Sequence, residues 1–258
     1  MNMRFIRYRF GDRICWGRLK GDSVVELSAA PWSAEFREVR RFLFDSDMPI
    51  FPPCEPSKII CVGKNYSAHI KELHPGEDLP KEPLLFLKPP STLLPPGGTI
   101  IMPPQSERVD YEGELAIVIG KKVSWGTKEE VQGAIFGYTL ANDVTARDLQ
   151  KKDGQWTRGK GFDTFCPVGP LLTRTVPEGS ILVTRVNGEE RQRAPLENMI
   201  FNPSGIVAYA STVMTLFPGD LILTGTPEGV GPLKAGDVVE IELQGIGILR
   251  NTVEKRIS

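Results

Sequence analysis

Residues 110–120 read DYEGELAIVIG and join clustered acidic side chains to a run of mostly β-branched apolar ones. The apolar run, which a glycine ends, predicts a β-strand over residues 112–120. Side chains two residues apart on a strand share a face, so we expect Glu112 and Glu114 to point the same way and to repel each other. Because a hard divalent cation is the usual partner of such clustered carboxylate oxygens, this strand is a candidate metal-binding element.

Asp143 offers a third carboxylate for the same site. It follows the apolar segment IFGYTL at residues 135–140, which could pair beside the first strand and bring Asp143 to the same edge. Asp110 shares the parity of Glu112 and Glu114, so parity alone leaves open which of these acidic residues bind. We rank Asp110 lower because it precedes the apolar run.

The alternative is that Glu112 and Glu114 only line the solvent face of a half-buried strand, which is the commoner arrangement for two glutamates at this spacing. Gly113 between them favours the functional interpretation. It has no side chain to bury on the opposite face, and a glycine inside a strand often marks a bulge or a close approach of another backbone.

The composition is that of an ordinary globular protein with a full core, since the 258 residues are 40% hydrophobic and 24% charged. Acidic and basic residues are interspersed and give a formal net charge of −1, so we expect no nucleic-acid partner and no electrostatic attachment to membranes. The 4 cysteines form no CxxC pair, which argues against a thiolate zinc site or a disulfide framework. No stretch has the length of a membrane-spanning helix or the apolar core of a secretion signal, so a cytoplasmic enzyme is the expectation.

The beginning of the chain predicts a small β subdomain. Residues 4–27 alternate apolar and polar side chains around two Gly-Asp turns, which is typical of a β-meander. A short helix is predicted over residues 36–44. The segment PIFPPCEP at residues 49–56 is a stiff linker. We therefore predict an N-terminal subdomain, residues 1–53, followed by a larger domain, residues 54–258.

The larger domain is expected to be rich in strands. Residues 181–193 predict a hairpin that turns at Asn187-Gly188, a pair typical of type I′ turns. A second hairpin is predicted over residues 238–253, and a helix over residues 204–216. The regular alternation of strands and helices that marks a parallel sheet is missing, so the predicted fold class is mixed α+β and β-dominated.

His69 and Glu72 are a candidate proton-transfer pair. Asn65 or Ser67 can cap a helical turn that places the two side chains three residues apart on one face. The acid would orient the imidazole and raise its basicity. The alternative is a weak surface pair, which is the commoner outcome for this spacing on a helix.

Three further polar residues allow competing interpretations. Lys160 stands between two glycines with aromatic residues nearby, a setting that suits a cation beside an anionic intermediate, although loop lysines are mostly exposed. Lys88 ends the strand-like segment LLFLK, and we interpret it as a solvated lysine. Thr145 to Asp148 have the form of a capping box, which makes Asp148 structural.

Four segments together resemble the signature segments of the fumarylacetoacetate hydrolase family, in the family's order. The resemblance extends from about Cys61 to the C-terminus. The segments are DYEGELAIVIG (110–120), FGYTLANDVTARDLQ (136–150), RGKGFDTFCPVGP (158–170) and GDLILTGTPEGVG (219–231). The resemblance implies a mixed β-sandwich roll of the family's type and a homodimer. It also implies that the metal ligands are Glu112, Glu114 and Asp143.

The resemblance implies roles for five more residues. His69 and Glu72 fall where the family's hydrolases activate water, and Lys160 falls on a catalytic lysine. Gln150 and Thr226 fall on positions that bind substrate. From the sequence alone, Gln150 would be an unremarkable polar residue.

The expected chemistry follows from oxygen-only ligation, which favours Mg²⁺ or Mn²⁺, with Ca²⁺ as a further candidate. A small 2-oxo acid can chelate such an ion, which then stabilises the enolate that forms when a bond to C3 breaks. If C4 is a ketone carbonyl, water activated by His69 and Glu72 attacks it. We therefore expect a metal-dependent hydrolase that cleaves a carbon–carbon bond in a 2,4-dioxo acid of the acylpyruvate or fumarylacetoacetate type.

The same motifs leave other reactions open. A substrate with a C4 carboxylate makes the enzyme a 2-oxo acid decarboxylase of the oxaloacetate type. A dienol substrate makes it a 2-hydroxyhepta-2,4-diene-1,7-dioate isomerase or decarboxylase of aromatic catabolism. A Schiff-base aldolase using Lys160 needs no metal, so the clustered carboxylates argue against it. The non-enzymatic alternative is a β-rich binding module with a structural ion, which leaves the surrounding His, Glu and Lys side chains unexplained.

Overall fold

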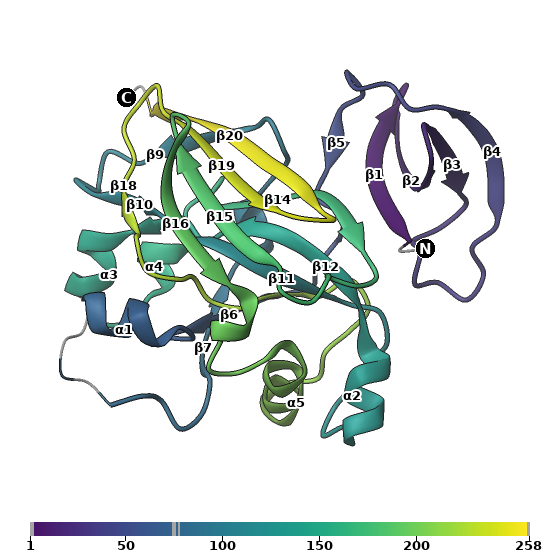
Figure 1. Cartoon of the computed structure of the whole chain (residues 1–258). Coiled ribbons are helices and arrows are strands. Elements are labelled where there is room, and N and C mark those ends of the chain that lie inside the picture. Colours follow the sequence, from purple (N-terminus) through teal and green to yellow (C-terminus); the bar gives the residue numbers. More distant parts are fainter. Residues whose placement is uncertain (1–2, 74–75, 77, 257–258) are drawn as a thin grey trace.

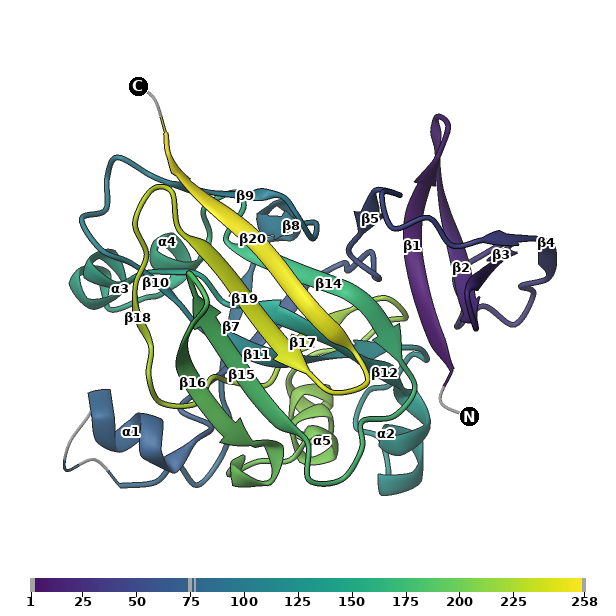
Figure 2. The ribbon, with the colours of Figure 1, turned by 45° about the horizontal axis from the view of Figure 1, so that its top comes forward.

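A computed structural model gives the structure of residues 3–73, 76 and 78–256. Strands dominate the described residues, which confirms the predicted fold class. The strands form one large sheet and two smaller ones, and Figures 1 and 2 show the second sheet lying across the large one in the body of the molecule. None of the helices in this part of the chain is long and apolar enough to cross a membrane.

The N-terminal strands form the predicted meander, which stands to one side of the body in Figure 1. The strands are β1 (Arg4–Phe10), β2 (Arg13–Lys20), β3 (Ser23–Leu27), β4 (Glu38–Leu43) and β5 (Ile50–Phe51). The helix predicted over residues 36–44 is wrong, because β4 pairs antiparallel with β3. Phe42 packs against the ring of Tyr8, and Arg40 pairs with Glu26. These tertiary contacts stabilise the strand and outweigh the local preference for a helix.

The large sheet continues from the meander into the body. Within the described residues its order is β4-β3-β2-β1-β14-β12-β11-β17-β6-β7. Its body strands are β6 (Ile59–Gly63), β7 (Leu84–Lys88), β11 (Gly113–Ile119), β12 (Ile135–Asn142), β14 (Cys166–Thr173) and β17 (Leu221–Leu223), and β8 (Leu93–Leu94) pairs with β14. Arg4 of β1 lies opposite Thr173 of β14, so the meander and the body share one sheet. The domain boundary after residue 53 stays a prediction.

The second sheet has the order β16-β15-β19-β20-β9 and contains both predicted hairpins. Its strands are β9 (Thr99–Met102), β15 (Ile181–Val186), β16 (Glu189–Pro195), β19 (Val238–Leu243) and β20 (Gly247–Lys255). Asn187 and Gly188, with φ of 54° and 79°, form the left-handed turn that their identities predict. The small third sheet joins β10 (Val109–Tyr111), β13 (Thr145–Ala146) and β18 (Gly231–Pro232).

The helices are short and lie around the sheets. They are α1 (Ser67–Leu73), α2 (Lys128–Ala134), α3 (Arg147–Asp153), α4 (Thr157–Lys160) and α5 (Pro203–Val213), with 3₁₀ turns at Pro90–Thr92 and Leu196–Asn198. The helix predicted over residues 204–216 is confirmed by α5 except at its end, because α5 stops at Val213 and Leu216 forms a β-bridge with Val123. Helix α5 begins where Asn202 accepts a hydrogen bond from Gly205 N, with Pro203 as the first helical residue.

Strand β11 is buried along its whole length because other elements cover both of its faces. Ile117 and Ile119 pack with residues of α2 and α5, including Ile206. Leu115 packs on the second sheet, where it meets Leu182. This double cover explains why the strand reads in sequence as an unbroken apolar run.

Gly113 of β11 lies in close contact with the second sheet. A Cβ atom on Gly113 would lie 2.1 Å from Thr184 Oγ1 and 3.3 Å from Gln192 Oε1. The close approach inferred from a glycine between two glutamates is therefore confirmed, and its partner is the β15–β16 hairpin.

We expect Gly113→Ala to lower the free energy of unfolding by about 1–3 kcal/mol, because the hairpin must move to admit the methyl group. Urea unfolding of the metal-free protein measures this change. Gly133→Ala is the control, since a Cβ on Gly133 would meet no atom within 4 Å. A loss for Gly113→Ala no larger than for Gly133→Ala would show that the hairpin does not press on this glycine.

Candidate active site

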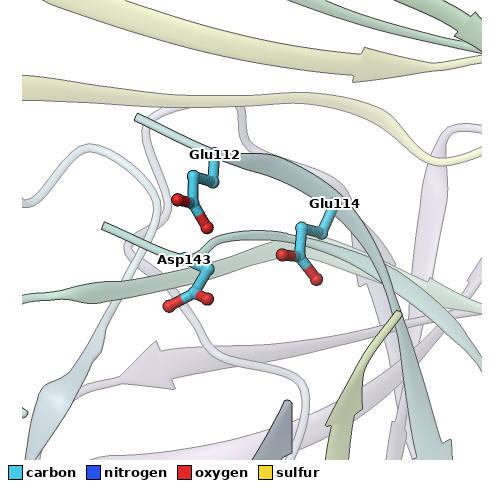
Figure 3. A group of neighbouring side chains, drawn as sticks. All are labelled: Glu112, Glu114 and Asp143. Atoms are coloured by element: carbon cyan, nitrogen blue, oxygen red, sulfur yellow. The ribbon is translucent and has the colours of Figure 1, made fainter. Parts of the chain in front are cut away.

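The three predicted ligand carboxylates come together at one end of two paired strands. Gly113 of β11 lies opposite Asn142 of β12, so Glu112, Glu114 and Asp143 meet across this pair. One ligand atom from each residue lies within 4.8 Å of the others, and all three residues are buried. Figure 3 shows the three carboxylates turned toward the same space.

Hydrogen bonds from backbone amides hold these ligand residues in place. Asp143 N donates to Glu112 O at 2.9 Å, and Glu112 N donates to the side chain of Asn142 at 2.9 Å. Gly225 N donates to Glu114 Oε2 at 2.6 Å. The ligand residues are therefore positioned by the strand pair and by the loop that follows β17.

Asp110 belongs to a different cluster from the triad. Its carboxylate accepts hydrogen bonds from Arg108 Nε and from Arg147 Nε, each at 2.9 Å. The shared parity with Glu112 therefore did not bring Asp110 into the triad, because Asp110 lies in β10, which belongs to another sheet.

Lys160 lies against the triad, at the end of α4. Its Nζ donates to Glu112 Oε2 at 2.8 Å and to Asp143 Oδ2 at 2.6 Å, and the side chain is only 2% exposed. The interpretation of Lys160 as a solvated loop lysine is therefore wrong, whereas its catalytic role stays a prediction.

Lys88 is a second buried cation at the site, and its interpretation as a solvated lysine is wrong. Its Nζ donates to Asp143 Oδ1 at 2.6 Å and to Val144 O at 3.0 Å. The two oxygens of Asp143 are thus held by two different lysines, Lys88 and Lys160. The sequence carried no local signal for this contact, because it depends on the pairing of β7 with β6.

Arg147 is the third buried cation, and sequence reasoning missed it. It pairs with Asp110 and Glu112, and its Nη1 donates to Gln150 Oε1 at 2.7 Å. The expected capping box hid this role, and that expectation is wrong. The N-cap of α3 is Ala146, while Thr145 donates to Asp143 O at 2.8 Å.

Asp148 is nevertheless a structural residue, as expected. Its carboxylate accepts hydrogen bonds from Ser106 Oγ at 2.6 Å and from Glu107 N at 2.9 Å. The motif predicted the kind of role correctly and the partners wrongly.

The electrostatic environments of Glu112 and Glu114 show whether a metal ion fits among the three carboxylates. Burial and the neighbouring carboxylates of Asp143 and Glu112 raise the pKa of Glu114 well above its ordinary value. Burial also opposes ionisation of Glu112, but Lys160 and Arg147 outweigh it and hold the pKa of Glu112 below its usual range. A divalent cation among the three carboxylates would give Glu114 the positive neighbour that Glu112 already has. The all-oxygen donor set fits such an ion.

His69 and Glu72 both lie on α1, as predicted. The distance from His69 Nδ1 to Glu72 Oε2 is 3.6 Å, which is too long for a hydrogen bond. Burial lowers the pKa of the His69 imidazole below its ordinary value, which favours the neutral form of the ring. Asn65 does not cap α1, because its side chain bonds instead to Phe201 and to Thr224 O.

The candidate residues line one cavity with a volume of about 250 Å³. Its walls include the triad, His69, Gln150, Lys160 and Thr226, together with Phe86 and Trp156. Thr226 Oγ1 donates to Gly113 O at 2.9 Å and accepts from Gln192 Nε2 at 2.8 Å, so its hydroxyl hydrogen is already engaged. The structure therefore places every predicted catalytic, substrate-binding and metal-ligating residue except Glu72 in the cavity wall.

Comparison with known proteins matches the chain to two family models. The fumarylacetoacetate hydrolase C-terminal model covers residues 58–254, and the Rv2993c-like N-terminal model covers residues 3–42. Among relatives, the mitochondrial oxaloacetate tautomerase FAHD2A of Bos taurus is 40% identical, with 98% of this chain and 92% of the relative covered. An uncharacterised protein of Methanocaldococcus jannaschii, MJ1656, is 56% identical over 78% of this chain and 84% of its own length.

Solved structures of similar fold include enzymes with different names. The 2-hydroxyhepta-2,4-diene-1,7-dioate isomerase of Mycobacterium marinum is 40% identical, with a TM-score of 0.89 over 99% of this chain and 100% of that one. The fumarylacetoacetate hydrolase of Exiguobacterium antarcticum is 34% identical, with a TM-score of 0.85 over 98% of this chain and 100% of that one. With its fold, its carboxylate triad and these matches along most of its length, the chain belongs to the fumarylacetoacetate hydrolase family.

Proposed function

We propose that this protein is a divalent-metal-dependent enzyme that interconverts the keto and enol forms of a small 2-oxo dicarboxylic acid of the oxaloacetate class. The observation that carries the proposal is that the imidazole of His69 and the triad of Glu112, Glu114 and Asp143 line the same cavity. At about 250 Å³, this cavity is smaller than the roughly 300–1,000 Å³ of pockets for drug-sized ligands, which favours a small substrate.

The chain's own residues account for the proton transfer. A divalent cation held by the triad supplies Lewis acidity toward the oxygens of a 2-oxo acid. The neutral imidazole of His69 takes the proton from C3 and leaves the electron pair in the enolate. The imidazolium of His69 then delivers this proton to the 2-oxo oxygen, which completes the enol and leaves the imidazole neutral again, and the reverse sequence restores the keto form.

Lys160 and Glu72 have supporting roles in this proposal. The ammonium group of Lys160, buried against Glu112 and Asp143, offsets negative charge as the enolate forms. Glu72 carries the negative charge that stabilises the imidazolium formed on His69. Lys160 lies within hydrogen-bond distance of Glu112 and Asp143, and Glu72 lies 3.6 Å from His69.

The names of the relatives support rearrangement over cleavage. The Bos taurus tautomerase and the Mycobacterium marinum isomerase are each 40% identical and match nearly the whole chain. The hydrolase from Exiguobacterium antarcticum is 34% identical. We therefore place tautomerisation ahead of the carbon–carbon hydrolysis that the sequence led us to expect.

Hydrolysis of a 2,4-dioxo acid is the second candidate, and the His69–Glu72 pair favours it. A neutral imidazole with a carboxylate 3.6 Å away is also suited to deprotonating water. Water would attack the C4 carbonyl, and the bond between C3 and C4 would break to give a carboxylic acid and an enolate, which is then protonated.

Parallel assays distinguish the candidates. We expect Mg²⁺ or Mn²⁺ to support accelerated decay of the enol absorbance of oxaloacetate, without release of pyruvate, and EDTA to abolish it. Metal-dependent release of pyruvate from acetylpyruvate would identify the hydrolase instead, and release from oxaloacetate alone a decarboxylase. No metal-dependent change with either substrate would overturn the proposal.

The choice of ion and the assembly state complete the proposal. Mg²⁺ and Mn²⁺ are the ions that the carboxylate donor set favours, with Ca²⁺ ranked third. The homodimer stays a prediction, which sedimentation velocity tests directly.

A further inference from the structure

Gly229 is bonded to two functional parts of the chain through its backbone. Its N–H donates to Glu72 Oε2 at 3.0 Å. Its carbonyl oxygen accepts a hydrogen bond from the Tyr111 hydroxyl at 2.8 Å. Tyr111 directly precedes the ligand Glu112, so this glycine connects the strand that leads into the triad with the carboxylate beside His69.

The backbone around Gly229 is pressed against the second sheet. Gly229 has a φ of +91°, and a Cβ atom there would lie 2.1 Å from Arg191 O of β16. The side chain of Gln192 donates to Pro227 O at 2.9 Å and so fixes the same loop two residues earlier. Only glycine can take this position, and its orientation then depends on the bonds that hold it.

Tyr111 is well placed to provide one of those bonds. It is 4% exposed and lies in the hydrophobic cluster that also contains Leu233 and Val239, so its ring is held by packing. The hydroxyl projects beyond this cluster to Gly229 O. Loss of the hydroxyl alone would therefore remove the hydrogen bond and leave the packing of the ring in place.

Glu72 needs such support. Its side chain is 37% exposed and belongs to the short helix α1, whereas the side chain of His69 is only 10% exposed. Among the described contacts of Glu72, the bond from Gly229 N is the one that ties its carboxylate to the body of the protein near His69.

We propose that Tyr111 is a positioning residue for the Glu72–His69 pair and acts through the backbone of Gly229. The inference rests on the proposed function, because it assumes that Glu72 assists His69 in proton transfer. Tyr111 itself touches neither substrate nor metal in this role. It fixes where the carboxylate of Glu72 stands relative to the imidazole.

The test combines Tyr111→Phe with Glu72→Gln, singly and together, in the full chain. We expect Tyr111→Phe to lower kcat by about three- to tenfold, the effect of one lost hydrogen bond, and to leave the Kd for Mn²⁺ within about twofold of the wild type. In the Glu72→Gln background, Tyr111→Phe should change kcat by less than about twofold, because the negative charge through which residue 72 acts on His69 is already gone. Tyr8→Phe is the matched control, since it removes another buried tyrosine hydrogen bond, to Glu26, in the N-terminal meander.

An NMR measurement adds a readout that does not depend on turnover. The chain has 2 histidines, so the imidazole ¹⁵N resonances are few, and His69→Gln assigns those of His69. We expect the His69 resonances to shift in Tyr111→Phe and to stay in place in Tyr8→Phe.

The outcomes separate the inference from the function on which it rests. If Glu72→Gln lowers kcat but Tyr111→Phe changes neither kcat nor the His69 resonances, the inference is wrong and the proposed function stands. Equal losses from Tyr111→Phe in both backgrounds would mean that Tyr111 does not act through Glu72, which also overturns it. If Glu72→Gln leaves kcat unchanged, the role proposed for Glu72 fails and the inference falls with it.

Discussion

Replacing Glu114 with glutamine is expected to weaken Mn²⁺ binding by at least about 100-fold, since even partners behind the ligands of metal sites are worth roughly 10–100-fold. The amide keeps the shape of the side chain and can still accept the hydrogen bond from Gly225 N. The substitution removes one negative charge from the triad. The described cluster contains no further carboxylate that could replace Glu114 as a ligand. Catalysis should fall to the level seen with EDTA.

Isothermal titration with Mn²⁺ measures the affinity, and thermal unfolding supplies an independent readout. Mn²⁺ should raise the Tm of the wild type, because an ion that binds only the folded state stabilises it, and should leave the Tm of Glu114→Gln almost unchanged. Glu129→Gln, an exposed change on α2, is the control. Wild-type affinity in Glu114→Gln would place the ion somewhere other than the triad.

Replacing His69 with glutamine is expected to lower kcat by roughly 10²–10⁴-fold, the usual contribution of a general base. His69 is not part of the carboxylate triad, so the affinity for Mn²⁺ should stay within about threefold of the wild type. The combination of lost turnover and retained metal distinguishes a proton-transfer residue from a ligand.

Steady-state kinetics at saturating Mn²⁺ and titration calorimetry test both halves of this prediction. If kcat stays within a few-fold of the wild type, another group moves the proton at C3. If metal affinity falls together with kcat, His69 acts on the metal site and the assignment of its role is wrong.

Strand geometry predicted that the acidic side chains cluster, whereas the choice of Glu112, Glu114 and Asp143 as the ligands came from the family resemblance. Glu112 and Glu114 share a face by the two-residue period of a strand, and Asp143 follows the segment that pairs with that strand. Gly113 indicated a close neighbour because a glycine inside a strand often marks the close approach of another backbone. Only the identity of that neighbour, the β15–β16 hairpin, required the structure.

The buried cations could not be predicted because their environment is tertiary. Lys88 ends an edge strand, and a lysine there is usually solvated. It becomes buried because Asp143, 55 residues later in the chain, lies within hydrogen-bond distance. Arg147 was hidden by a pattern typical of helix capping, which the structure does not use because Thr145 bonds to Asp143 O instead.

The helix predicted over residues 36–44 failed for a related reason. Local preferences in this segment are weak, and pairing with β3 decides its conformation. The choice among tautomerase, decarboxylase and hydrolase is also beyond local patterns, because each reaction passes through the enolate of a 2-oxo acid and the same motifs are compatible with each of them.

The most direct test of the proposed chemistry is the position of deuterium introduced at C3 during ketonisation. The enol of oxaloacetate is mixed with enzyme and Mn²⁺ in D₂O, and malate dehydrogenase with NADH traps the keto product at once as malate for NMR. We expect deuterium at one of the two C3 positions only, because a base fixed in the cavity serves one face of the enol, and we expect this selectivity to vanish with EDTA. Deuterium distributed equally over both positions, as in the absence of enzyme, would contradict the proposal that this site transfers the proton.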